Sequence, residues 1–284
     1  MSLLPTVGAG DQSTAASFYP YTIDNSLRFD HKSTSDQLNR QMGGSGNRKT
    51  HTLSFWIKRC QLVNINGGLQ TVLDAGNASN NYSRYIFTHT GTDQFEIPSK
   101  ASGTVQYDLV TALTFHDTAA WYHFVITFDT TQGTDSKRIK VYINGVLQTG
   151  FSESVYPSQN SNTIVNSSIA HYFGRASWTS AFWLDAYLAE INFVDGHALA
   201  PESFGETKSG AWIPVNYANK ISEISRTDGT AIGDLTGQSG LSAAFDGTLF
   251  KTTQILQQRA QMELLLILVK IGVLALHTLL LVLL

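Results

Sequence analysis

A length of 284 residues and a net charge of −3 leave room for one large domain with an appendage, and they provide no basic surface for nucleic acid. Charged residues make up only 14% of the chain, so we expect its surfaces to bind by hydrogen bonding rather than by charge. The single cysteine, Cys60, excludes an intrachain disulfide and a cysteine-based zinc site, and it is expected to be a buried or idle thiol. The N-terminus has no basic region followed by an apolar run, so no signal peptide is predicted.

Residues 1–16 are small and polar and predict a flexible arm. The strongest strand patterns come later, at residues 51–59 (HTLSFWIKR) and in the meander of residues 120–147. Asn144-Gly145 in that meander is the strongest short hairpin signal in the chain. A further strand is expected over residues 146–151, followed by a long polar loop in which Glu153 is isolated.

Other short runs with strand character occur between turn-forming residues, and they cover 26–29, 38–40, 70–75, 84–88, 94–97, 106–115, 169–175 and 183–194. About a dozen short strands at this spacing predict an all-β fold, an antiparallel sandwich of two sheets. No helix of ordinary length is required between residues 17 and 200.

Several of these runs carry a resemblance to a known family. TLSFWIKR, AWYHFVITFD, IKVYINGV, YFGR and LDAYLAEINFVDGHAL resemble the laminin G-like branch of the concanavalin A-like lectin/glucanase superfamily. More narrowly, SLRF, GNRKTHTLSFWIKR, YPSQN and AEINFVDGHALAPESFGET resemble such domains encoded by marine tailed bacteriophages. The resemblance covers about residues 17–215 and implies a two-sheet antiparallel jelly-roll β-sandwich. Ala186 stands where the family pattern has glycine, which predicts slightly different packing of the last strand.

The resemblance implies a non-enzymatic carbohydrate-binding protein of a phage virion, which attaches to a surface or decorates the particle. The implied partners are cell-surface or virion glycans and other virion proteins, with a homo-oligomer expected and no nucleic acid. Two alternatives stay open, a purely structural virion component without a sugar site and a membrane-anchored surface lectin. A glycan depolymerase is the less favoured third alternative.

Aromatic residues fall into two groups. Those in strand runs are expected to lie in the core, and they are Trp56, Trp121, Phe124, Phe128, Tyr142, Phe173, Tyr187 and Phe193. Those in polar loops are candidates for stacking on a sugar ring, and they are Tyr82, Tyr156, Trp178 and Trp183. A loop tryptophan with nothing to pack against is costly unless a ligand or a subunit covers it.

Calcium is the one cofactor considered, because some laminin G-like domains hold it with turn carboxylates. Asp74, Asp93 and Asp135 are the candidate ligands, since a hard cation prefers carboxylate and carbonyl oxygens. The chain has no compact DxDxDG loop, and the alternative is that these residues simply make turns.

Glucanases of this fold use paired carboxylates on one strand, often as ExDxE, and this pattern is absent. Asp185 and Glu190 are five residues apart, which places them on opposite faces of a regular strand. No HExxH or GxSxG motif occurs either. The sequence therefore favours a protein that is not an enzyme.

The C-terminal part departs from the strand pattern. Residues 216–248 predict a polar linker, and residues 249–284 an apolar, helical tail. Its run 264–284 is long enough to span a bilayer, although Lys270 and His277 inside it are costly. The alternative is a loss of the native reading frame after about Thr248. With permitted codons, a shifted frame turns residues 266–283 into YIGKNWGVGTSHTITGVV, which resembles the start of a discoidin-like β module. Stop codons in the shifted frame would exclude this alternative, and the membrane anchor would be the remaining interpretation.

Overall fold

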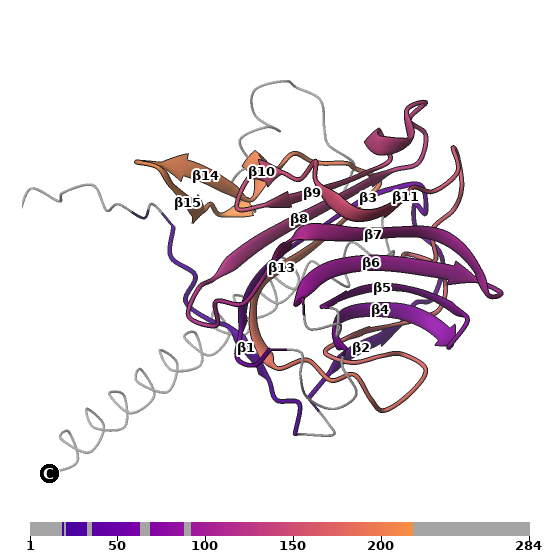
Figure 1. The fold of residues 1–284 in the computed structure, drawn as a ribbon, viewed down its shortest axis with the longest axis horizontal. Helices are drawn as coiled ribbons and strands as arrows, with labels where there is room; N and C mark the ends of the chain where they lie inside the picture. Colours follow the sequence, from indigo (N-terminus) through magenta and orange to yellow (C-terminus); the bar gives the residue numbers. More distant parts are fainter. Residues whose placement is uncertain (1–18, 20, 33–35, 63–68, 88–91, 218–284) are drawn as a thin grey trace, which may run out of the picture.

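The computed structural model describes residue 19 and residues 21–32, 36–62, 69–87 and 92–217, which form two antiparallel sheets and a small hairpin (Figure 1). The predicted all-β sandwich is confirmed. The predicted arm 1–16, the linker beyond Tyr217 and the tail 249–284 lie outside the described residues.

The first sheet has six strands in the order β1-β13-β3-β8-β9-β10. Their bounds are β1 Leu27–Phe29, β3 Thr50–Arg59, β8 Tyr122–Asp129, β9 Ile139–Ile143, β10 Val146–Leu147 and β13 Ala186–Asp195. The alternating apolar pattern of the sequence predicts β3, β8 and β9 to within one residue. Opposite residues such as Phe55 and Phe124 pair across the strands, so their apolar side chains share one face.

The second sheet has seven strands in the order β11-β7-β6-β5-β4-β12-β2. Their bounds are β2 Leu38–Gln41, β4 Gln70–Ala78, β5 Asn81–Phe87, β6 Gln94–Ala101, β7 Thr104–Thr114, β11 Phe151–Val155 and β12 Ala170–Phe173. Figure 1 shows β4 to β7 as curved ribbons side by side in front of the six-stranded sheet, and their pairing is antiparallel.

Two 3₁₀ turns and a separate hairpin complete the described elements, namely η1 Asp135–Lys137, η2 Pro201–Ser203, β14 Gly205–Lys208 and β15 Ala211–Pro214. Within the described ranges, no helix has the length and apolar character needed to cross a membrane.

Aromatic side chains fill the space between the sheets. Phe124 of the first sheet stacks on Phe55 at 5.3 Å between ring centroids and meets Phe95 of the second sheet at 4.6 Å. Phe87 and Phe115 close the cluster with edge-on contacts. Burial of this apolar surface, at roughly 25 cal/mol per Å², is the main force that holds the two sheets together.

The outer face of the six-stranded sheet is also covered, which explains why β8 is buried on both faces. Trp212 of β15 donates a hydrogen bond from Nε1 to Nδ1 of His123 at 2.9 Å, and the two rings stack. His123 then donates from Nε2 to the Ser54 hydroxyl at 2.9 Å, because a neutral imidazole has one donor and one acceptor. A Cβ atom at Gly145 or Gly205 would lie 2.4 Å from the Trp212 ring, so both glycines make room for it.

Several details of the sequence prediction are wrong, and Tyr142 and Tyr187, expected in the core, are half-buried. The strand expected over 146–151 is broken, because β10 pairs with β9 whereas β11 pairs with β7 of the other sheet. The chain crosses between the sheets at Gly150, whose carbonyl accepts from the amide of Ala112. The polar loop therefore begins later than expected, and Glu153 lies in a strand. Trp121 precedes β8 and is 38% exposed rather than buried in the core.

Candidate functional site

The outer face of the seven-stranded sheet carries an ordered row of side chains, most of which are polar. Tyr85 and Phe87 of β5 point into the core, so Arg84, the residue before Tyr85, points outward by the alternation of a strand. Strand register continues this position across six strands, and we call the resulting set the cross-strand row: Tyr172, Asp74, Arg84, Pro98, Asp108 and Val155. Five strand spacings of ~4.8 Å make the row about 24 Å long.

Arg84 is the centre of this row. Its Nε donates to Oδ2 of Asp74 at 3.1 Å. The guanidinium lies 3.5 Å from the ring centroid of Tyr82 and 5.6 Å from that of Trp178, both distances suited to cation–π contact. Within the described residues, Nη2 of Arg84 and Oδ1 of Asp74 are buried and have no hydrogen-bond partner. A buried donor and a buried acceptor without partners are costly, and a polar ligand would satisfy both.

The segment of residues 174–184 places Trp178 above Arg84. The amide of Ser177 donates to Oδ2 of Asp74 at 2.9 Å, and the carbonyl of Phe182 accepts from the amide of Thr71 at 3.1 Å. Gly76 allows this close approach, because a Cβ there would lie 2.9 Å from Oγ of Ser177. Burial raises the pKa of Asp74, and the Arg84 guanidinium and the Ser177 amide oppose that rise.

The four aromatic candidates from the sequence have different surroundings. Trp178 is 38% exposed and meets Tyr82 through Arg84. Tyr82 is not in a loop, because the turn before it has only two residues and β5 already begins at Asn81. Trp183 is buried and donates from Nε1 to the carbonyl of Ser180, and Tyr156 packs against the edge of the core. The structure therefore brings two of the four candidates together.

A group of three carboxylates on the same face was missed by the sequence analysis. This acid cluster consists of Glu96 of β6, Asp108 of β7 and Glu153 of β11. Burial, followed by the charges of Asp108 and Glu153, raises the pKa of Glu96 to about 7. Burial and then the charge of Glu153 raise the pKa of Asp108 to about 6. Interaction between the two side chains adds to the rise for Glu96 and opposes the rise for Asp108, as expected when Glu96 is the protonated partner.

The carboxylates that the sequence analysis considered for catalysis do not pair. Asp185 precedes β13 and forms an ion pair with Arg28 at 2.6 Å. Glu190 accepts from the hydroxyl of Tyr21 at 2.7 Å. The assumption of a regular strand is wrong here, because β13 has a bulge beside Glu190, whose φ is 47°.

The three calcium candidates do not converge on one point. Asp74 is bound by Arg84, whereas Asp93 pairs with the fully buried Arg59 at 2.6 Å. Asp135 lies in the turn η1, where its carboxylate accepts from the amide of Ser136. The calcium prediction stays untested.

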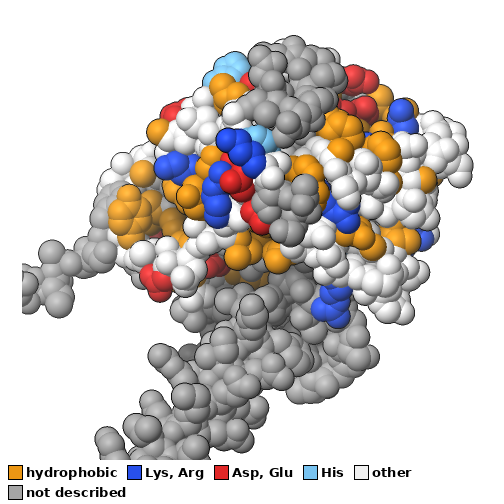
Figure 2. All heavy atoms as spheres, turned by 90° about the horizontal axis from the view of Figure 1, so that it is seen from below, with side chains coloured by type: hydrophobic (Ala, Val, Ile, Leu, Met, Phe, Trp, Pro, Cys, Tyr) orange, Lys and Arg blue, Asp and Glu red, His pale blue; other side chains and the backbone are white. Residues whose placement is uncertain are grey.

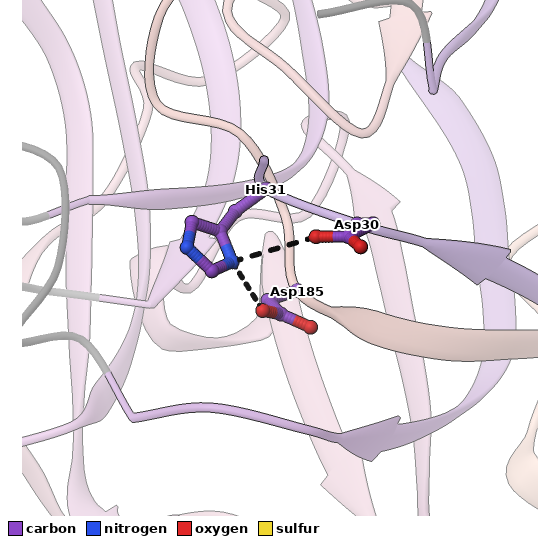
Figure 3. A group of neighbouring side chains, drawn as sticks. All are labelled: Asp30, His31 and Asp185. Carbon is purple, nitrogen blue, oxygen red and sulfur yellow. Dashed lines mark hydrogen bonds and ion pairs between the residues drawn. The ribbon is translucent and has the colours of Figure 1, made fainter. Parts of the chain in front are cut away.

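One other group in the described ranges has ligand atoms within 4.8 Å of one another, and it consists of Asp30, His31 and Asp185 (Figure 3). Asp30 and His31 follow β1, and Asp185 precedes β13. In Figure 3 the His31 ring directs Nδ1 toward both carboxylates. An imidazole with two carboxylates is a donor set that suits a divalent transition metal.

Comparison with known proteins identifies one family. A family model described as the concanavalin A-like lectin/glucanases superfamily matches residues 30–203. A search of curated proteins found no match.

Among solved structures, the chain is similar to domain 4 of AbnA, a GH43 extracellular arabinanase from Geobacillus stearothermophilus in complex with arabinotriose, with 20% identity and a TM-score of 0.38. That alignment covers 55% of this chain and 65% of the other. The CBM40 domain of Ruminococcus gnavus IT-sialidase has 12% identity, coverage of 58% and 95%, and a TM-score of 0.40. The SAP-like pentraxin of Limulus polyphemus has 12% identity, coverage of 64% and 76%, and a TM-score of 0.39. We draw no functional conclusion from similarities of this size.

Proposed function

Because the chain belongs to the concanavalin A-like lectin/glucanases superfamily, we propose that it binds a glycan along the cross-strand row without cleaving it. A fold alone does not give a function, so the proposal rests on the site. The observation that carries it is the Arg84–Asp74 pair, which lies beside the rings of Tyr82 and Trp178 and keeps one buried donor and one buried acceptor without partners.

Neighbouring hydroxyls of a sugar match this pair chemically. One hydroxyl would accept from Nη2 of Arg84 and the next would donate to Oδ1 of Asp74; both atoms are buried, so this contact requires the segment of residues 174–184 to move aside. Trp178 offers an exposed ring for the apolar face of the same sugar. Because the row continues over six strands, the ligand is an oligosaccharide rather than a single sugar.

We also propose where this binding takes place. The resemblance to tailed-phage domains supports a role in surface attachment or virion decoration, with host or virion glycans as partners. In a purely structural virion protein, a subunit interface would instead cover Trp178. A membrane-tethered lectin requires that the run 264–284 is genuine.

A second candidate function, glycan cleavage, is favoured by the acid cluster. Glycoside hydrolysis needs one carboxylic acid that is protonated near neutral pH and a second carboxylate that acts as base or nucleophile. Glu96 meets the first requirement with its pKa of about 7, and Glu153 is a neighbouring carboxylate.

The test is retention of the full chain on immobilised host-cell polysaccharide, with product sizes followed over time. We expect Trp178→Ala to weaken retention by about tenfold or more. Trp121→Ala is the matched control, because Trp121 is equally exposed at 38% but lies beside the other sheet. Equal retention of the two variants would refute the proposed site. If the wild type shortens the polysaccharide and Glu96→Gln does not, cleavage would be established. Loss of retention when metal ions are chelated would restore a role for calcium.

A further inference from the structure

Strand pairing assembles the group of Asp30, His31 and Asp185, whose members come from distant parts of the sequence. The last residue of β1, Phe29, pairs with the first residue of β13, Ala186. The strands are antiparallel, so the residues just after β1 lie beside the residue just before β13. Both Phe29 and Ala186 are buried, and this packing fixes the position of the three ligand side chains.

The side chains are also oriented one by one. Oδ1 of Asp30 accepts from the amide of Lys32 at 2.9 Å and lies 3.8 Å from Nδ1 of His31. The same Nδ1 contacts Oδ2 of Asp185. His31 and Asp185 have side chains that are 9% and 6% exposed, whereas that of Asp30 is 46% exposed. The group is therefore closed on the protein side and open to solvent beside Asp30.

Arg28 binds the remaining oxygen of Asp185. Its Nη2 lies 2.6 Å from Oδ1, which directs Oδ2 toward His31. Carboxylates that bind metals are commonly held in this way by a second group. The guanidinium also neutralises part of the negative charge, so it limits the affinity for a cation without occupying the point where the three ligand atoms converge.

We propose that Asp30, His31 and Asp185 bind one divalent first-row transition metal of the Zn²⁺ type, with solvent completing its coordination. The ligand atoms are Oδ1 of Asp30, Nδ1 of His31 and Oδ2 of Asp185. Imidazole nitrogen with carboxylate oxygen favours this class. Calcium is disfavoured because it takes six to eight oxygen ligands.

A metal bound here would link the residues that follow β1 to Asp185, at the end of the segment of residues 174–184. Asp185 directly follows this segment, and the carbonyl of Gly174 accepts from the amide of Leu184 at 2.9 Å. Figure 2 views the side where β1 and β2 lie in Figure 1, and basic, acidic and histidine side chains gather on part of this face. Binding at this site does not depend on whether the protein binds a glycan.

The competing interpretation is an ion-pair cluster in which protonated His31 and Arg28 balance the two carboxylates. Calorimetric titration of the full-length protein with Zn²⁺, without an affinity tag, separates the two. All proteins carry Cys60→Ser, because this exposed thiol neighbours Asp185 and a thiolate is a zinc ligand that would confuse the titration. We expect one Zn²⁺ per chain and, with Co²⁺ as a probe, visible absorption bands on binding.

Asp30→Asn and His31→Gln are expected to weaken binding by more than about tenfold. Asp30 is half-exposed, so its variant keeps the fold, and circular dichroism checks this. The matched control is His116→Gln, because Nε2 of His116 lies 3.5 Å from a carboxylate of Asp93, and the described residues place no third metal-ligating group with this pair. No stoichiometric binding, binding that both variants retain, or binding of Ca²⁺ in place of Zn²⁺ would overturn the proposal.

Discussion

At the scale of single residues, the buried histidines make stability depend on acid. Burial lowers the pKa of His51 and of His123 to about 3 and that of His171 to about 4. Each folded-state pKa lies below the ordinary value of 6.5, so the folded protein favours the neutral ring. As the pH falls below 6.5, the unfolded chain takes up these protons first. The histidines therefore lower the free energy of unfolding from that pH downward, each by up to about 1.4 kcal/mol per pH unit.

His51 allows a direct test of this dependence. Its ring stacks on Phe128 at 4.7 Å and on Phe193 at 5.4 Å, and neither ring nitrogen has a hydrogen-bond partner among the described residues. We expect His51→Phe to raise the free energy of unfolding at pH 7 by about 1–3 kcal/mol, because two unsatisfied buried nitrogens are removed. In urea denaturation at pH 7, 5.5 and 4.5, the unfolding free energy of His51→Phe should fall less steeply with decreasing pH than that of the wild type. His197→Phe, at an exposed position, should leave the slope unchanged.

Glu96 predicts the opposite dependence. Its folded-state pKa of about 7 lies above the ordinary value of 4.5, so the folded protein retains the proton longer than the unfolded chain. The stability from this group is present below pH 4.5 and is lost as the pH rises to about 7. Glu96→Gln should therefore gain about 1–3 kcal/mol over the wild type between pH 4.5 and 8. Chemical denaturation at pH 5 and 8 measures the gain, with the exposed Glu202→Gln as control. If Glu96→Gln and the wild type differed in unfolding free energy by the same amount at both pH values, the raised pKa of Glu96 would be contradicted.

At the scale of elements, the hairpin β14–β15 depends on close packing. A Cβ at Gly205 would lie 2.4 Å from Cζ2 of Trp212, so Gly205→Ala must displace the indole from His123. We expect a loss of about 1–3 kcal/mol in the free energy of unfolding. Gly133→Ala is the control, because no atom lies within 4 Å of its Cβ position. The packing assigned to Trp212 would be wrong if urea denaturation gave both variants the same stability.

Elements with a clear apolar alternation were predictable, and elements at sheet edges were not. The alternation in HTLSFWIKR places Leu53, Phe55 and Ile57 on one face, and all three are fully buried. In β11, FSESV, only Phe151 packs on the core and the other four residues are exposed, so the apolar period is absent. The hairpin β14–β15 is similarly short, and its cover over β8 depends on a single tryptophan.

At the scale of the whole molecule, the site depends on pairing between distant strands. The sequence predicts Trp178 as a candidate for sugar stacking because it lies in a polar loop. Its cation–π contact with Arg84 follows from the Asp74–Ser177 hydrogen bond, which the sequence does not reveal. Glu96 and Asp108 are twelve residues apart, and β6 and β7 pair with a register shift beside Glu96. A one-residue slip would turn one carboxylate to the other face, so sequence alone does not determine the acid cluster.

The boundary of the folded unit is the last prediction. The family model ends at residue 203, yet Trp212 covers His123 on the outer face of the six-stranded sheet. A fragment of residues 17–217 should unfold at the same temperature as the sandwich in the full chain. A fragment of residues 17–203 should unfold roughly 10 °C lower, because losing a packed tryptophan costs about 3–5 kcal/mol. Calorimetry of both fragments measures this difference. Equal midpoints would mean that the hairpin only rests on the sandwich, and that Ser54, His123 and Trp56 keep their packing without it.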